Sequence, residues 1–459
     1  MMISYEGSGY SPMKRQNRLR RGFKPVVLSL FAIFLSIVVL NPAPSFGSGT
    51  TDEAMSYIPD SLVSLAAGHA IVIDKTMQRL FVYRFDGTSF QRMYEATCST
   101  GKNKGTKIRS GDARTPEGVY FPIKFFSDEE LGAIYGSMAF DLNYPNILDR
   151  KEGKNGNNIW LHGTDKPLTP YQSNGCITLE NGDIDAVSRF IILNETPVII
   201  QDYIKWVSPS IQAAQREDIT PFIDDWASAV CAGSVRKLTG LYAKNSRYDK
   251  KGWGRLAGQI ETLKEYGGEV TLVPQELSLL KHDKYTVAIF RQGFALNGHP
   301  YDGGLRKLFL KKWRNDWYVE GEVTVTPEKE SQFLAALEKI NTDYANRNDI
   351  RKIVDTWIAS WEAGDMKGYA SFYADDFRSK GMNRDRWLAY KSDLSRTNRD
   401  IRIEIKDLKI TYQSRRRAVA TFEQDYHSSR VNDVGIKTLR LKKVDDSWKI
   451  CKETWRSKG

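Results

Sequence analysis

A histidine and a cysteine stand fourteen residues apart in this chain, each next to a glycine. His162 is followed by Gly163, and Cys176 follows Gly175 and precedes Ile177, Thr178 and Leu179. Cysteine alone is a weak nucleophile at neutral pH, because its thiol has a pKa of about 8.5 and stays mostly protonated. An imidazole beside the thiol accepts its proton and later protonates a leaving amine. The pattern predicts acyl transfer through a thioester, if neighbouring strands bring the two side chains together.

Gly175 adds to this chemistry, because a residue without a side chain allows close approach to the backbone. The amide of Cys176 would then donate a hydrogen bond to the oxyanion that forms on the attacked carbonyl. The alternative is a structural cysteine and a strand-end histidine that is satisfied by a backbone carbonyl, since most cysteines are inert packing. The other three cysteines, Cys98, Cys231 and Cys451, are predicted to pack in the interior, with a redox or site-edge role as the alternative for Cys98.

The elements that must position the pair belong to a β-rich domain predicted over residues 61–203. Apolar runs bounded by turn residues predict its strands. These are 70–73, 80–83, 92–97, 119–125, 159–162, 177–179 and 197–201. One helix is predicted over residues 183–193, where Ile184, Val187, Phe190 and Ile191 share a face.

This domain resembles the YkuD-like L,D-transpeptidase family over residues 69–201. The similarity rests on the His-Gly and Ser-Asn-Gly-Cys segments and on three upstream stretches. The latter are residues 99–102, residues 111–120, and residues 140–150 with Phe140, Asn143, Tyr144, Asn146 and Arg150, which look like the ErfK/YafK branch. The resemblance implies that Cys176 is the nucleophile and His162 its general base. It also implies that the carbonyl of Gly163 orients the imidazole, and that the amides of Gly175 and Cys176 hold the oxyanion.

Two positions depart from the family pattern. Asn174 stands where many members have a second histidine, and it can still donate hydrogen bonds. Thr178 stands where many members have an arginine, and it cannot pair with a substrate carboxylate as arginine does. The resemblance implies substrate contacts at Ser173, Asn174, Asn143, Tyr144, Asn146 and Arg114. The missing positive charge would come from Arg114, Lys124, Arg150 or Lys166, among which the sequence does not choose.

The remainder of the chain repeats itself. Trp226 and Trp357, Tyr242 and Tyr373, and Trp317 and Trp448 all lie 131 residues apart. A constant offset over this length indicates two copies of one fold. We predict repeat 1 over residues 215–326, a connecting helix over 327–345 and repeat 2 over 346–459. A helix followed by alternating strands resembles the nuclear transport factor 2-like (NTF2-like, SnoaL-like) fold, so the predicted class is α+β throughout. The tryptophans of the two repeats are expected to pack in the core or, alternatively, to line a ligand-binding cavity.

Residues 1–47 have the organisation of an export signal. They combine six basic residues, one acid and an uncharged apolar run at 26–40. As a helix this run is about 22 Å long, shorter than the hydrocarbon core of a membrane, so cleavage near Gly47 is favoured over a retained membrane tether or a buried helix. Residues 48–60 are mostly small and polar and are predicted to form a linker. Without residues 1–47 the formal charge falls from +11 to +6, which does not imply nucleic-acid binding.

The sequence predicts neither a metal site nor a cofactor. Its five histidines are scattered, its four cysteines form no Cys-x-x-Cys pair, and it has no phosphate-binding loop. The family resemblance implies that the substrate is the peptidoglycan stem tetrapeptide and that the product is a 3-3 crosslink, made in the periplasm or cell envelope. The alternatives are an L,D-carboxypeptidase that trims tetrapeptide to tripeptide, and a non-catalytic wall-binding scaffold. The repeats are predicted to position substrate, to form a homodimer or to bind a cell-wall protein.

Overall fold

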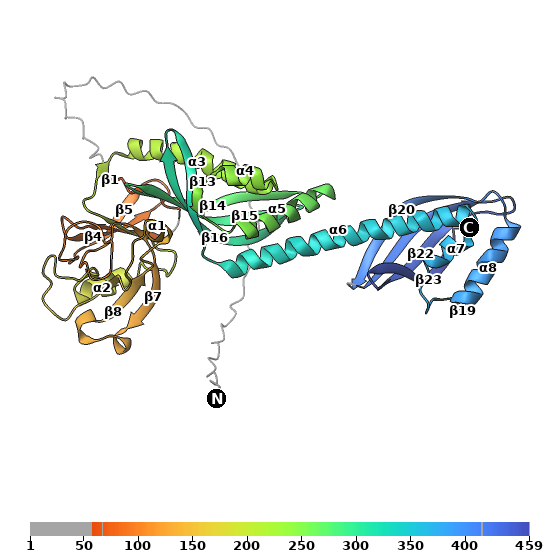
Figure 1. Cartoon of the computed structure of the whole chain (residues 1–459), viewed down its shortest axis with the longest axis horizontal. Helices are drawn as coiled ribbons and strands as arrows, with labels where there is room; N and C mark the ends of the chain where they lie inside the picture. The colour runs from red at the N-terminus through yellow and green to blue at the C-terminus, as the bar shows by residue number, and fades with distance from the viewer. Residues whose placement is uncertain (1–56, 67, 415, 459) are drawn as a thin grey trace, which may run out of the picture. The chain divides into compact units, whose positions relative to one another are not determined.

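The computed structural model describes residues 57–66, 68–414 and 416–458 (Figure 1). The predicted export signal and most of the linker lie outside the described residues. Among those described, no helix is long and apolar enough to cross a membrane. The catalytic region, repeat 1 and repeat 2 follow each other along the chain and combine helices with antiparallel or mixed sheets. The predicted α+β class is confirmed.

Two sheets form the region that carries His162 and Cys176. The first has the order β5-β4-β3-β11-β6 and the second the order β10-β9-β8-β7. The strands of the first are β3 (His69–Asp74), β4 (Arg79–Phe85), β5 (Phe90–Thr97), β6 (Gly118–Tyr120) and β11 (Val198–Gln201). Those of the second are β7 (Pro122–Ser127), β8 (Met138–Leu142), β9 (Trp160–His162) and β10 (Ile177–Thr178). Short helical segments connect them: η1 (Asp128–Glu130), η2 (Ala133–Tyr135), α1 (Ile147–Lys151) and α2 (Asn181–Ser188).

The central strand β3 is apolar at consecutive positions because both of its faces are covered. Ile71 and Ile73 pack in one core with Leu161 and Ile177 of the second sheet. Ala70 and Val72, whose side chains point the other way, pack in a different core together with residues of repeat 1. A strand buried on both faces reads as a continuous apolar run.

Two predicted elements differ from those in the structure. The strand predicted over 119–125 is divided between β6, which pairs with β11, and β7, which pairs with β8. The helix predicted over 183–193 begins two residues earlier and ends at Ser188. It ends there because Thr196 intervenes: its hydroxyl accepts from the amide of Ile192 and donates to the carbonyl of Phe190.

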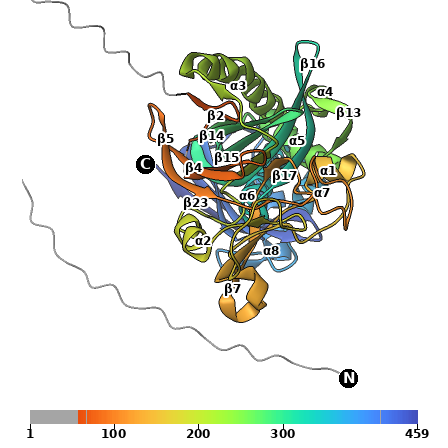
Figure 2. The same cartoon turned by 90° about the vertical axis from the view of Figure 1, so that its left-hand side faces the viewer.

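Each repeat places helices beside a sheet, which is antiparallel in repeat 2 and mixed in repeat 1, where β13 and β17 are parallel. Repeat 1 contains α3 (Pro209–Cys231), α4 (Val235–Gly240), β13 (Tyr242–Arg247), α5 (Lys250–Glu265), β14 (Val270–His282), β15 (Tyr285–Leu296), β16 (His299–Trp313) and β17 (Asp316–Thr324). Repeat 2 contains α7 (Met366–Ser371), β18 (Arg378–Ser379), β19 (Met382–Asn383), α8 (Arg384–Thr397), β20 (Arg402–Ser414), β21 (Arg417–His427), β22 (Asn432–Val444) and β23 (Ser447–Ser457). In repeat 1, α3 packs against β14 (Figures 1 and 2).

One helix, α6 (Pro327–Glu362), joins the repeats without a break. The sequence suggested a connecting helix up to residue 345 and a separate helix opening repeat 2. The structure merges them, since residues 328–362 contain no proline or glycine to end a helix. Phe333 and Leu337 near its start pack in the core of repeat 1. Trp357 and Trp361 near its end pack in the core of repeat 2.

The catalytic region and repeat 1 share backbone pairing as well as a core. Strand β2 (Leu62–Ser64), predicted as part of the catalytic domain, instead joins the sheet of repeat 1 by pairing with β14. Strand β1 (Ile58–Pro59) pairs with β12 (Trp206–Val207), so the two ends of the catalytic region are paired with each other. Across the contact, the hydroxyl of Tyr285 accepts from the amide of Val119 at 2.9 Å. The domain boundary predicted at residue 61 therefore assigns β2, a strand of the sheet of repeat 1, to the catalytic domain.

Candidate active site

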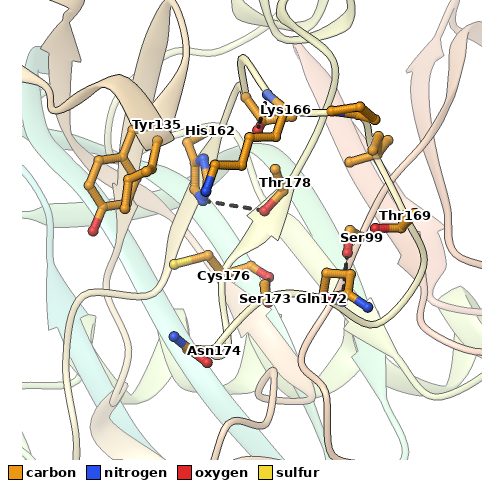
Figure 3. A pocket seen from close by; sticks show the side chains of 14 residues that line it. Ser99, Tyr135, His162, Lys166, Thr169, Gln172, Ser173, Asn174, Cys176 and Thr178 are labelled. Atoms are coloured by element: carbon orange, nitrogen blue, oxygen red, sulfur yellow. Dashed lines mark hydrogen bonds between the residues drawn. The ribbon is translucent and has the colours of Figure 1, made fainter.

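Cys176 and His162 are brought together by the parallel pairing of β9 and β10. Leu161 lies opposite Ile177 and His162 opposite Thr178, and the first two face the core. Side chains alternate along a strand, so His162, Thr178 and Cys176 share the other face. Both members of the predicted pair line one pocket on this face (Figure 3).

The backbone fixes the tautomer of His162. Nδ1 of its ring lies 2.6 Å from the carbonyl oxygen of Gly163. A carbonyl can only accept, so Nδ1 carries the proton and Nε2 of the neutral ring presents a lone pair. The imidazole is buried, and this burial lowers its pKa below the ordinary value. The ring is therefore held neutral and oriented as a base, as the resemblance implied for Gly163.

The thiol of Cys176 is held protonated at rest. Burial raises its pKa, a backbone hydrogen bond from Trp160 opposes this, and the carboxylate of Asp141 raises it further. Its sulfur lies 3.5 Å from the carbonyl oxygen of Asn158, to which the S–H donates. A raised thiol pKa next to a lowered imidazole pKa describes a neutral pair, so the thiolate must form by proton transfer during the reaction.

Thr178 contacts the imidazole of His162, which the sequence did not predict. Its hydroxyl oxygen lies 3.3 Å from Nε2 of His162, and it must donate because Nε2 carries no proton (Figure 3). The position was recognised only as a departure from a family arginine. The parallel register, which sets Thr178 directly opposite His162, was the information that could have revealed the contact.

We expect Thr178→Val to make Cys176 more reactive towards alkylation at neutral pH. The change removes the hydroxyl that occupies the Nε2 lone pair, and a neutral hydrogen bond of about 1 kcal/mol corresponds to a rate increase of about five-fold. Iodoacetamide labelling followed by mass spectrometry measures this rate. Thr178→Ser keeps the donor and serves as the control, and slower labelling of the valine variant would contradict the expectation.

The loop before Cys176 is shaped by Gly175, whose φ is +131°. A Cβ there would meet the carbonyl oxygen of Arg114 at 2.7 Å, so only glycine fits. Ser173 ties this loop together: its hydroxyl donates to the carbonyl of Cys176 at 2.6 Å and accepts from the amide of Gly175 at 3.1 Å. The Gly175 amide would have to leave Ser173 to hold an oxyanion, which favours the amide of Cys176 for that role.

The pocket around the pair has a volume of about 350 Å³. It is lined by Ser99, Ile134, Tyr135, His162, Thr164, Lys166, Pro167, Leu168, Thr169, Gln172, Ser173, Asn174, Cys176 and Thr178. The ring of Tyr135, which sequence reasoning missed, stands edge-on to His162 with centroids 5.1 Å apart. No periodicity or motif marks Tyr135, because it comes from the isolated turn η2.

Several predicted substrate contacts lie elsewhere. Ser173 and Asn174 line the pocket, whereas Arg114, Asn143, Tyr144 and Asn146 do not. Asn146 is buried at the start of α1, caps that helix and donates to the hydroxyl of Tyr285 in repeat 1. Tyr144 is buried, and Asn143 accepts from the amide of Phe121. These three residues support the fold and the contact with repeat 1 in this structure.

The remaining questions from the sequence concern Cys98, a metal site and four basic residues. Cys98 is completely buried, and burial raises the pKa of its thiol to about 12. Among the described residues, no group of three or more His, Cys, Asp or Glu side chains could hold a metal ion. Of the four basic residues considered for a substrate carboxylate, Lys166 is the one that lines the pocket.

The geometry of Cys176 and His162 is the one that the resemblance to L,D-transpeptidase catalytic domains implied. Residues 68–200 match the family model described as "YkuD: L,D-transpeptidase catalytic domain". Residues 349–454 match the model described as "Cds6 C-terminal NTF2-like domain". The chain thus carries a YkuD catalytic domain and a C-terminal NTF2-like domain, as the resemblances implied for these two regions. The NTF2-like fold of repeat 1 and the ErfK/YafK branch stay predictions.

Solved structures also resemble the chain. Bd1075 of Bdellovibrio bacteriovorus is 20% identical over 88% of this chain and 99% of its own, with a TM-score of 0.34. The helical cell shape determining protein Pgp2 of Campylobacter jejuni is 18% identical over 88% of this chain and 96% of its own, with a TM-score of 0.28. An NTF2-like protein of Shewanella oneidensis is 21% identical over 24% of this chain and 98% of its own, with a TM-score of 0.21. No curated protein matches the sequence.

Proposed function

We propose that this protein is a cysteine-dependent L,D-transpeptidase that forms 3-3 crosslinks between peptidoglycan stem peptides. The observation that carries the proposal is the His162 tautomer: the Gly163 carbonyl holds the proton on Nδ1, so Nε2 is available as a base on the face that Cys176 shares. The YkuD match over residues 68–200 supports the reaction class and the peptide substrate.

In the proposed first half-reaction, Cys176 attacks the carbonyl of the third residue of a stem tetrapeptide. The thiol proton moves to Nε2 of His162 as the S–C bond forms, and the amide of Cys176 donates to the oxyanion. His162 then gives this proton to the amine of the terminal D-alanine as the C–N bond breaks. A thioester on Cys176 and free D-alanine result.

In the second half-reaction, the acceptor amine attacks the thioester. His162, neutral again, takes the amine proton and returns it to the sulfur as the S–C bond breaks. We propose that the ammonium of Lys166 attracts a peptide carboxylate, since this side chain lines the pocket and Thr178 cannot make such a pair. The amide of Asn174, whose side-chain oxygen accepts from Lys102 at 3.1 Å, is a further candidate contact.

Purified protein incubated with tetrapeptide muropeptides tests the proposal by chromatography and mass spectrometry. We expect crosslinked dimer and free D-alanine. Tripeptide alone, with acceptor amine present, would instead assign an L,D-carboxypeptidase, in which water takes the place of the amine. Intact tetrapeptide, with Cys176 labelled by iodoacetamide no faster than Cys451, would leave a wall-binding scaffold as the function.

We further propose that the protein works in the periplasm or cell envelope, where its substrate is found. The export signal predicted over residues 1–47 supports this location. Fractionation of cells, with antibody detection of the mature chain, tests it, and recovery in the cytoplasmic fraction alone would contradict it.

A further inference from the structure

The two repeats share one buried polar motif. Its equivalent members are Trp226, Tyr242, Arg306 and Glu322 in repeat 1, and Trp357, Tyr373, Lys437 and Glu453 in repeat 2, each pair 131 residues apart. In both copies the indole N–H donates to the tyrosine hydroxyl, at 3.1 Å and 3.0 Å. That hydroxyl donates to the glutamate, at 2.7 Å and 2.6 Å. Because the motif recurs in both repeats, the side chains that surround it can be compared position by position.

In repeat 1 the motif is closed by side chains. Arg306 donates to Gln292 at 2.9 Å, to Glu322 at 3.1 Å and to Glu330 of α6 at 2.6 Å. Phe333, one turn further along α6, stacks on Phe294 with ring centroids 3.9 Å apart. The buried cation of repeat 1 is thus surrounded by acceptors from its own chain.

In repeat 2 the corresponding region is a cavity of about 260 Å³. Aromatic and aliphatic side chains form most of its wall, and a few polar groups reach into it. The lining residues used below are Trp361, Tyr390, Lys391, Gln424, Lys437 and Trp455. Flat apolar walls with few polar groups are typical of small-molecule sites.

One wall of this cavity carries an amide oxygen without a partner. Gln424 is 6% exposed, and its Oε1 is buried without a hydrogen bond. In repeat 1 the amide at the same place in the strand pairing is Gln292, since Gln292 and Gln424 each lie two residues after the strand partner of Arg306 or Lys437. Gln292 accepts from Arg306 and donates to the carbonyl of Gly303. A buried polar atom without a partner is costly, so a bonded donor at Gln424 would be stabilising.

The other distinctive group is Lys391, which repeat 1 lacks. Trp387 and Lys391 on α8 correspond to Trp253 and Ala257 on α5, each pair four residues apart. The ammonium of Lys391 lies 4.6 Å and 5.3 Å from the ring centroids of Trp361 and Trp387.

The acid nearest to Lys391 already has other partners. Lys391 is 3.6 Å from Glu453, but that carboxylate is bound by Lys437 at 2.7 Å and by Tyr373 at 2.6 Å. The buried Lys437 and the partly buried Lys391 therefore share one buried anion. Asp433, the acid that lines the cavity, is held by the indole N–H of Trp455 and by the hydroxyl of Ser457. Burial lowers the pKa of Lys391 to about 8, as expected for an ammonium that is not fully compensated.

We propose that the cavity of repeat 2 is a binding site for a small carboxylate that carries a ring. The carboxylate would pair with Lys391, a donor group would reach Gln424, and the ring would stack on the aromatic wall. Aromatic acids and sugar acids share this chemistry, because both present a flat apolar face beside a carboxylate. The two copies then have different roles, since repeat 1 is closed and docked on the catalytic region, while repeat 2 receives a ligand.

Calorimetric titration of the full chain carrying Cys176→Ala tests the site without any turnover. Indole-3-acetate and glucuronate are the probes for the two sources, and indole-3-acetamide and glucuronamide are their neutral controls. We expect at least one acid to bind about ten-fold more tightly than its amide, because charge-assisted hydrogen bonds are stronger than neutral ones. Lys391→Met should abolish that preference, whereas Lys452→Met, on the same strand as Glu453 but exposed, should preserve it.

A second variant guards against loss of folding. Tyr390 lies at the rim and is 40% exposed, so Tyr390→Ala should leave the fold intact and weaken binding of the preferred acid. Thermal melting of each variant verifies folding. Acid and amide binding equally, no heat for any probe, or a preference that persists in folded Lys391→Met would each overturn the proposal. None of these results bears on the reaction at Cys176.

Discussion

Cys176→Ala is expected to reduce formation of both crosslinked dimer and tripeptide to the uncatalysed background. In the proposed mechanism Cys176 supplies the atom that bonds to the substrate, and no other described cysteine lines the pocket. Removing a covalent nucleophile typically costs several orders of magnitude, about 10⁶-fold where it has been measured for a catalytic triad. Intact-mass spectrometry with tetrapeptide should show an acyl adduct on the unmodified protein and none on the variant.

Cys451→Ser is the matched control for this experiment. Cys451 is also half-buried and its pKa is also raised by burial, but it lies in β23 of repeat 2. We expect this variant to keep full activity and the acyl adduct. Activity that survives in Cys176→Ala and is lost in Cys451→Ser would show that the nucleophile has been assigned to the wrong strand.

His162→Gln is expected to lower the turnover of tetrapeptide by about 10²–10⁴-fold, the usual contribution of a general acid–base. Glutamine has no lone pair that can take a proton from the thiol at neutral pH, and no acid for the leaving amine. Burial raises the pKa of Cys176, so the thiol of this variant stays protonated until the pH is well above neutral. Rates of crosslinking and of iodoacetamide labelling, both followed against pH, measure the two losses.

The two rates should respond differently to alkali. Labelling of His162→Gln should recover as the pH rises through the pKa of the thiol, because only the thiolate is required. Crosslinking should stay low, because the leaving D-alanine still lacks its acid. In the unmodified protein, activity should persist to a pH below about 6.5 before the imidazole protonates, since burial lowers the pKa of His162. An acid limb well above pH 6.5 would contradict the assignment of His162 as the base.

Much of the site could be read from the chain because its parts are local. His162 and Cys176 each end or begin a short apolar stretch, and such stretches become the paired strands β9 and β10. Gly175 in the sequence indicates the loop before Cys176. Its backbone conformation and its close approach to Arg114 leave no room for a side chain. The Gly163 carbonyl follows His162 directly, so the orientation of the base was also within reach of the sequence.

Three of the predicted substrate contacts do not line the pocket. Asn143, Tyr144 and Asn146 look like cleft residues in a polar turn, and the resemblance pointed to substrate. Instead, Asn146 caps α1 and donates to Tyr285, a residue of repeat 1 that lies more than a hundred positions away. Asn143 accepts from the amide of Phe121, and Tyr144 is buried. Likewise, residues 62–64 fall within the predicted catalytic domain but form β2, which pairs with β14 in the sheet of repeat 1. Nothing in the local pattern specifies a partner so far along the chain.

The amino-acid sequence by itself was enough to predict the pair of His162 and Cys176, the 131-residue repeat and the α+β class, because these depend on residue type, short spacing and periodicity. Only the tertiary structure decided which lone pair Thr178 occupies, which lysine enters the pocket, and that one copy of the repeat is closed by Arg306 while the other leaves Gln424 unpaired. The reason is physical: hydrogen bonds and charge pairs depend on distances between groups that the fold brings together from remote positions, and these distances exist only once the chain has packed.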